Sequence, residues 1–231
     1  MSAVHASVSE LDLRTLGLRA VNHALHEASA GAAFEVLNPD GGHALAAGLR
    51  SDVSVEIRGH AGYYCAGMNQ HATVRVHGNV GVGVGENMMS GQIEVRGSAG
   101  QSAGASAHGG LLVVAGDAAA RCGITLKGAN IVVRGSVGHS SAFMAQTGRL
   151  VVLGDAGAGL GDSIYEARLY VRGSVSDLGA DCIEKPKRDE HQKELSELLG
   201  AAGIEDAAPA GFRRFGSART LYHWQPSKSG I

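Results

Sequence analysis

The sequence predicts an all-β fold, a right-handed parallel β-helix solenoid of about seven 19-residue coils, with short flanking helices and a C-terminal arm. Seven short strand-like runs, such as VEIRG and VRVHG, each end in glycine. These glycines recur every 19 residues without an insertion: Gly59, Gly78, Gly97, Gly116, Gly135, Gly154 and Gly173. An unbroken period is typical of a solenoid whose coils stack in one register.

The residues around each glycine form columns that predict which side chains face inward. The residues four and two positions before the glycine are always aliphatic; in the first coil they are Val55 and Ile57. Because side chains alternate faces along a strand, both positions point to the interior. Positions three and seven after the glycine hold only Gly, Ala or Ser. We expect the glycines to supply positive φ angles at corners, and the small columns to let the coils pack around a narrow axis.

The repeat divides the chain into four parts. Residues 1–33 form an N-terminal segment with a short capping helix that ends near Gly31, and residues 34–184 form the β-helix. Residues 185–203 contain a C-terminal helix, because Leu195, Leu199 and their neighbours repeat at helical spacing. Residues 204–231 form an extended arm rich in aromatic and arginine side chains.

Composition excludes several classes of function. The 20 Lys and Arg residues are balanced by 22 Asp and Glu, so the chain lacks the basic surface that nucleic acids require. It also lacks a long apolar run and a secretion signal. We therefore expect no nucleic-acid partner, no membrane contact and a cytoplasmic location.

Neither the glycines nor the cysteines predict a cofactor or metal site. The GVGVG run at residues 81–85 resembles a dinucleotide fingerprint, but Gly81 and Gly85 already belong to the small columns. Cys65 and Cys122 are three repeats apart in one column, and Cys182 is separate, so we expect buried thiols rather than ligands. The histidines show no metal-binding spacing.

The carboxylates do not predict catalysis either. Glu56 and Glu94 share one outward column, but Arg75 stands between them, which predicts a ladder of charges instead of an acid/base pair. The sequence thus predicts no catalytic residue, no bound cofactor and no metal in this chain.

Two features predict contact surfaces. The outward column becomes apolar at Val113, Val132, Val151 and Tyr170. Such a stripe needs a cover, and the chain's own helix around Leu195 is favoured slightly over a partner subunit.

The C-terminal arm is predicted to be an interface arm, because aromatic and arginine side chains dominate protein interfaces. Its candidate interface residues are Phe212, Arg213, Arg214, Phe215, Tyr222 and Trp224.

The repeated G-x-x-G-x-x-x-[GA] coil over residues 34–184 resembles the glycine-rich β-helix domain that closes the large chain of glutamate synthases, which is also seen in a subunit of formylmethanofuran dehydrogenase. Segments such as GHAGYYCAGMNQ, GENMMSGQIEVRG and LGADCIEK look like the small β-helix subunit of N-methylglutamate synthase. That resemblance implies a complex that makes N-methylglutamate and ammonia from methylamine and glutamate.

The resemblance implies a role in assembly and no catalytic residue. The partners that it implies are a glutaminase-like subunit and a synthase subunit carrying FMN and an iron–sulfur cluster, braced against each other by the β-helix. The chain begins Met1-Ser2, without the N-terminal cysteine of such glutaminases, and lacks the cysteine cluster of the synthase subunit.

Three alternatives remain open. The chain could be a subunit of an ordinary glutamate synthase. It could also belong to a formylmethanofuran-dehydrogenase-like complex, which copurifying tungsten or molybdenum would distinguish from an N-methylglutamate synthase that carries FMN and iron–sulfur. An independent polysaccharide hydrolase or lyase would need clustered carboxylates in a groove and a secretion signal, and the sequence shows neither.

Overall fold

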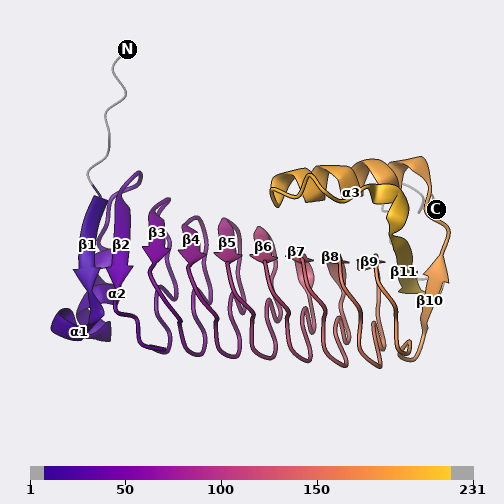
Figure 1. Cartoon of the computed structure of the whole chain (residues 1–231), viewed down its shortest axis with the longest axis horizontal. Helices are drawn as coiled ribbons and strands as arrows, with labels where there is room; N and C mark the ends of the chain where they lie inside the picture. Colours follow the sequence, from indigo (N-terminus) through magenta and orange to yellow (C-terminus); the bar gives the residue numbers. More distant parts are fainter. Residues whose placement is uncertain (1–7, 220–231) are drawn as a thin grey trace, which may run out of the picture.

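The computed structural model describes residues 8–219 and shows a parallel β-solenoid with one strand per coil (Figure 1). Each strand from β1 to β9 pairs in parallel with the next, and Val55 lies opposite Val74, one 19-residue repeat later. The prediction of a parallel β-solenoid of about seven turns is confirmed. These strands are β1 (Val8–Asp12), β2 (Ala33–Leu37), β3 (Ser54–Ile57), β4 (Thr73–Val76), β5 (Gln92–Val95), β6 (Leu111–Val114), β7 (Lys127–Val133), β8 (Thr147–Val152) and β9 (Arg168–Val171).

The N-terminal end contains a strand that the sequence did not predict. Strand β1 pairs in parallel with β2, and helices α1 (Leu13–Leu16) and α2 (Leu18–His26) connect the two. Helix α2 buries Val21 and Leu25 against the solenoid core. Phe34 lies opposite Val55, a spacing of 21 residues, so this end departs from the period by which the other strands were recognised.

The inward columns form the core as predicted. Val55 and Ile57 are completely buried, and so are Val74 and Val76 in the next coil. Each aliphatic pair stacks on the equivalent pair of the neighbouring strand, which makes one continuous apolar column along the axis.

With one exception, the seven repeat glycines do not supply the predicted positive φ angle. Gly59 is the only one of them with a positive φ, 145°. At Gly97, a Cβ atom would lie 2.7 Å from the carbonyl oxygen of Gly78 in the preceding coil. Close stacking of backbone on backbone therefore excludes a side chain. The positive φ angles occur seven residues later, for example at Gly104, where φ is 65°.

A ladder of polar side chains follows these glycines. In successive coils, His60 Nδ1 accepts from the Asn79 N–H at 2.9 Å, and Asn79 Oδ1 accepts from the Ser98 N–H at 2.9 Å. The same bond recurs through Ser98, Asp117, Ser136 and Asp155 to Ser174. Each side chain thus satisfies a backbone donor of the next coil, which holds the corners in register.

Replacing Asn79 with alanine is expected to lower the free energy of unfolding by about 0.5–1 kcal/mol, because the Ser98 N–H loses its acceptor. Urea denaturation measures the change. The matched control is Asp52→Ala at an exposed position outside the ladder, and it should leave stability within about 0.5 kcal/mol. Equal effects of the two substitutions would show that the ladder does not stabilise the coils.

The C-terminal end closes by a reversal of chain direction. Strand β10 (Cys182–Lys185) is followed by helix α3 (Asp189–Ala201), the short 3₁₀ helix η1 (Pro209–Gly211) and strand β11 (Arg213–Ser217). Strand β11 inserts between β9 and β10 and is antiparallel to both. The prediction of an extended arm is therefore wrong for residues 213–217, because their backbone groups complete the sheet.

Candidate functional site

The outer face of the sheet has an open, charged half. In strands β3 to β5, Arg75 Nη1 donates to Glu56 at 3.0 Å and Arg75 Nε donates to Glu94 at 3.2 Å. His77 Nε2 lies 2.5 Å from the other oxygen of Glu56. Burial alone would raise the pKa of Glu56, but the bonds from His77 and Arg75 outweigh it and lower that pKa. The predicted charge ladder is confirmed.

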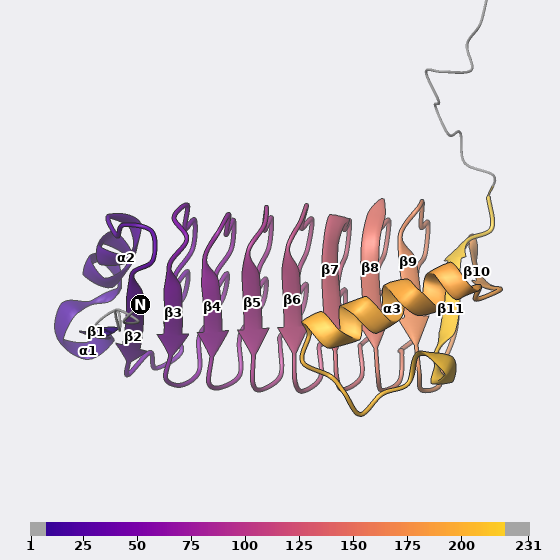
Figure 2. The same ribbon diagram turned by 90° about the horizontal axis from the view of Figure 1, so that it is seen from above.

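The other half of this face is apolar and covered. Figure 2 shows α3 lying across β7, β8 and β9 while β3 to β5 stay open. Val132, Val151 and Tyr170 are completely buried and pack with Leu195 and Leu199 of the helix. The chain's own helix is thus the cover, as the favoured interpretation predicted.

This cover corrects the candidate interface. Val132, Val151 and Tyr170 face α3, so a partner subunit cannot dock on them while the helix is in place. Val113, at the margin of the stripe, is 5% exposed. The apolar stripe therefore packs against a helix of the same chain and stabilises the fold of this chain.

The interface prediction is also wrong for the two phenylalanines of the arm. Phe212 packs in the cluster beneath α3, and Phe215 points into the solenoid core. Arg213 is exposed and pairs with Glu184, and its guanidinium lies 5.3 Å from the centre of the Phe215 ring. Arg214 is partly buried opposite Tyr170.

The remaining members of the arm, Tyr222 and Trp224, lie outside the described residues.

A partly buried carboxylate connects α3 to the sheet. Glu194 accepts from Arg149 Nη2 at 2.6 Å, from Arg168 Nη1 at 2.7 Å and from the Tyr170 hydroxyl at 2.6 Å. Burial opposes the charge of Glu194, but the bonds from Arg149 and Tyr170 and the two arginine charges prevail and lower its pKa. Burial, together with the Glu194 contact, raises the pKa of Tyr170. The sequence pattern gives no signal for Glu194, because its role depends on strand residues that precede it by 24 to 45 positions.

Substituting Glu194 with glutamine is expected to remove a pH-dependent part of the stability. A carboxylate whose pKa is lower in the folded state stabilises the protein at pH values above its ordinary pKa, which is 4.5 for glutamate. This stabilisation is lost as the pH falls below 4.5 and through the lower pKa of the folded state. The difference in unfolding free energy between the wild type and E194Q should therefore be largest near about pH 6 and shrink towards about pH 3. Urea titrations across this range measure it.

The control is Glu197→Gln on the exposed side of the same helix. Its effect at about pH 6 should be smaller than that of E194Q, because Glu197 makes none of the three bonds that hold Glu194. A difference between the wild type and E194Q that does not change with pH would contradict the assignment.

The cysteines are buried and unreactive. Burial raises the pKa of both the Cys65 and the Cys122 thiol to about 12, and that of Cys182 to about 11. An iron–sulfur cluster needs adjacent thiolates, and these residues do not fit one. Within residues 8–219, no group of three or more His, Cys, Asp and Glu side chains is arranged to hold a metal ion. Over the same residues, no helix has the length and apolar character needed to cross a bilayer.

Large apolar side chains are exposed on the turns that connect the strands. Met68 is 47% exposed and Met89 of the next coil is 48% exposed. Met144 and Tyr165 make a similar pair farther along, also in neighbouring coils, with 39% and 43% exposure. Methionine and tyrosine are enriched at protein interfaces. The sequence pattern did not indicate these positions, because they lie outside the strand columns.

Comparison with known proteins identifies one family. No protein-family model matches the chain. Protein GlxC of Rhizobium meliloti (strain 1021) is 56% identical over 217 residues, which cover 93% of this chain and 95% of that protein.

A solved structure shares the fold. It is a chain of the formyltransferase/hydrolase complex FhcABCD from Methylorubrum extorquens in complex with methylofuran, with a TM-score of 0.56 and 22% identity, covering 86% of this chain and 89% of that one. At that identity the likeness shows the solenoid fold alone. The identity to GlxC extends over nearly the whole of both chains, and this protein therefore belongs to the GlxC family.

Proposed function

We propose that this chain is a non-catalytic assembly subunit of a multi-subunit, glutamate-synthase-like enzyme. The observation that carries the proposal is the set of exposed side chains on the turns, Met68, Met89, Met144 and Tyr165. They project from a rigid solenoid whose coils are linked by backbone bonds on every side. A rigid body with spaced apolar side chains suits the docking of other chains.

The resemblance of the coils to the glycine-rich β-helix domain of glutamate synthases supports the assignment to a glutamate-synthase-like enzyme. The finer proposal is N-methylglutamate synthase, in which the solenoid braces a glutaminase-like subunit and a synthase subunit that carries FMN and an iron–sulfur cluster. The complex would convert methylamine and glutamate to N-methylglutamate and ammonia, in the cytoplasm. The part of this chain would be to hold the two partners at a constant separation, since every coil advances the surface by one strand spacing of about 4.8 Å.

Affinity purification of the tagged chain from its native host tests the proposal. We expect glutaminase-like and flavin-containing chains in the eluate, flavin and iron–sulfur absorbance, and methylamine-dependent formation of N-methylglutamate. Formation of glutamate from glutamine alone would indicate an ordinary glutamate synthase, and copurifying tungsten or molybdenum would indicate a complex like formylmethanofuran dehydrogenase. Recovery of a single colourless protein would contradict the assembly role.

Charged substitutions then locate the docking surface. The double variants M68E/M89E and M144E/Y165E are each expected to release partner chains, because a buried, unpaired carboxylate opposes docking. The control is Leu16→Glu, an equally exposed apolar side chain on α1. If both double variants retain the partners as well as Leu16→Glu does, the turns are not the docking surface.

A truncation tests the remaining part of the predicted arm. Ending the chain after Arg219 removes Tyr222 and Trp224 and leaves β11 and its partners intact. We expect the thermal unfolding of the solenoid to be unchanged and the recovery of partner chains to fall. Full recovery of the partners from the truncated chain would refute an interface role for these residues.

A further inference from the structure

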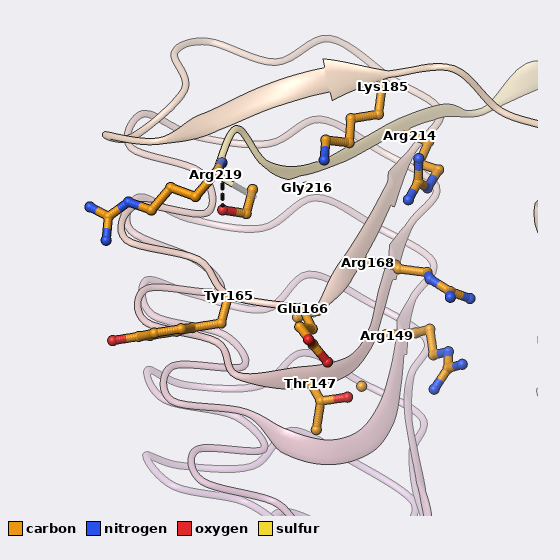
Figure 3. Close-up of a pocket in the computed structure, with 12 residues that line it drawn as sticks. Thr147, Arg149, Tyr165, Glu166, Arg168, Lys185, Arg214, Gly216 and Arg219 are labelled. Atoms are coloured by element: carbon orange, nitrogen blue, oxygen red, sulfur yellow. Dashed lines mark hydrogen bonds between the residues drawn. The ribbon is translucent and has the colours of Figure 1, made fainter. Parts of the chain in front are cut away.

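A hollow at the C-terminal end of the solenoid is lined mainly by cations. It has a volume of about 320 Å³ and lies between the beginnings of β8 and β9 and the end of β11. One carboxylate, Glu166, also lines it, and Figure 3 shows that side chain pointing towards Thr147 and away from Lys185. The cationic side chains that line it are Arg149, Arg168, Lys185, Arg214 and Arg219.

Three of these cations form ion pairs, with two carboxylates between them. Arg149 and Arg168 share Glu194, and Arg219 pairs with Asp181. Counting Glu194, Asp181 and Glu166, three carboxylates face five cations, which leaves an excess of two positive charges. The hollow can therefore accept a doubly negative ligand without a net excess of negative charge.

Lys185 and Arg214 account for that excess. They are directly opposed in the β10–β11 pair, and Figure 3 shows them together at one end of the hollow. Within residues 8–219, no ion pair joins either of them to a carboxylate. Arg214 Nη1 donates to the carbonyl oxygen of Pro186 at 3.2 Å, whereas its Nε is buried without a hydrogen-bond partner. That Nε–H is enclosed by the protein, so an anion in the hollow would interact with the charge of the guanidinium and with its Nη groups.

Gly216, the glycine of β11, lines the hollow. From Gly78 to Gly173, the backbone of the preceding coil leaves no room for a side chain at the repeat glycines, but no such contact exists at Gly216. A Cβ atom there would meet only Lys185 Cδ and the Ala167 carbonyl oxygen, both at 3.7 Å, and the φ of Gly216 is not positive. Packing therefore does not require a glycine at this position. Close approach of a ligand to the backbone is one of the reasons for which strands carry a glycine.

We propose that this hollow binds a small dianion, a dicarboxylate or a phosphate, between Lys185, Arg214 and the backbone of Gly216. Arginine presents a planar fork of N–H donors that suits both carboxylate and phosphate oxygens, and the lysine adds a point charge. The volume is in the range of small-ligand pockets. The proposal concerns this chain alone and does not depend on the assembly role.

Calorimetric titration of the purified full-length chain tests the site, with inorganic phosphate and glutarate as the two probes at constant ionic strength. We expect saturable binding of at least one probe at a single site, and the stronger one identifies the ligand chemistry. Lys185→Met and Arg214→Met should each weaken binding at least about tenfold, because each removes a charge-assisted bond. Gly216→Val should abolish binding with the charges unchanged, and Arg50→Gln, at an exposed position near the other end of the chain, should have no effect.

Thermal unfolding of each variant without ligand checks that the C-terminal end is still folded, and Gly216→Ala offers a milder substitution if valine destabilises it. Three results would overturn the proposal: no saturable binding of either probe, equal binding by the wild type and the Lys185 and Gly216 variants, or binding of an acidic peptide in the absence of any small-anion binding. The last result would make the hollow a contact for a protein segment.

Discussion

Replacing Gly97 with alanine is expected to lower the free energy of unfolding by about 3 kcal/mol, although it adds only one methyl group. That methyl group would lie 2.7 Å from the Gly78 carbonyl oxygen and 2.8 Å from its carbonyl carbon. These are backbone atoms of the preceding coil, so they can move only if the stacking of the coils is disturbed. Denaturation in urea or guanidinium measures the loss.

The control is the same substitution in an open position. Gly200 lies in α3, and a Cβ atom there would have no neighbour within 4 Å. Gly200→Ala is expected to stabilise the protein by about 0.5–1 kcal/mol, because alanine favours the helix. Opposite signs for the two substitutions would establish that contact between coils selects the repeat glycines. A loss at Gly97 of under about 0.5 kcal/mol would refute the register described above.

Substituting Leu195 with alanine is expected to weaken the docking of α3 by about 2–4 kcal/mol, because the side chain is completely buried against the apolar stripe. The helix has few other apolar anchors, so its backbone amides should exchange hydrogen faster while those of β3 to β5 stay protected. Hydrogen exchange followed by mass spectrometry resolves the two regions.

Leu198→Ala is the matched control, since Leu198 is on the same helix and only partly buried. It should increase exchange in α3 by a smaller factor than Leu195→Ala does. Similar exchange in both variants would mean that Leu195 does not anchor the helix, and the stripe under α3 would then be available to a partner.

The regular part of the fold could be predicted because it is local and repeated. The alternation of Val55 and Ile57 with polar residues identifies the inward face, and the 19-residue period transfers that assignment to every coil. The ladder of Glu56, Arg75 and Glu94 was predictable for the same reason, since equal spacing places these residues on neighbouring strands.

The ends of the molecule could not be predicted in this way. Strand β1 lies outside the period, and β11 is antiparallel and joins two strands that are consecutive in the sequence. A short run such as RRFGS has no pattern that separates a closing strand from an interface arm. Its two phenylalanines were recognised as residues that need burial, but the sequence alone did not show that the chain buries them itself.

The sequence by itself determined the solenoid, its period, its inward columns and the existence of an apolar stripe that needs a cover, because these follow from side chains at a constant spacing. Only the tertiary structure decided what covers the stripe, why each repeat position must be glycine, and which charges meet at the C-terminal end. Those outcomes depend on contacts between segments far apart in the chain, such as Glu194 with Arg149 and Lys185 with Arg214, and on backbone distances that no single coil specifies.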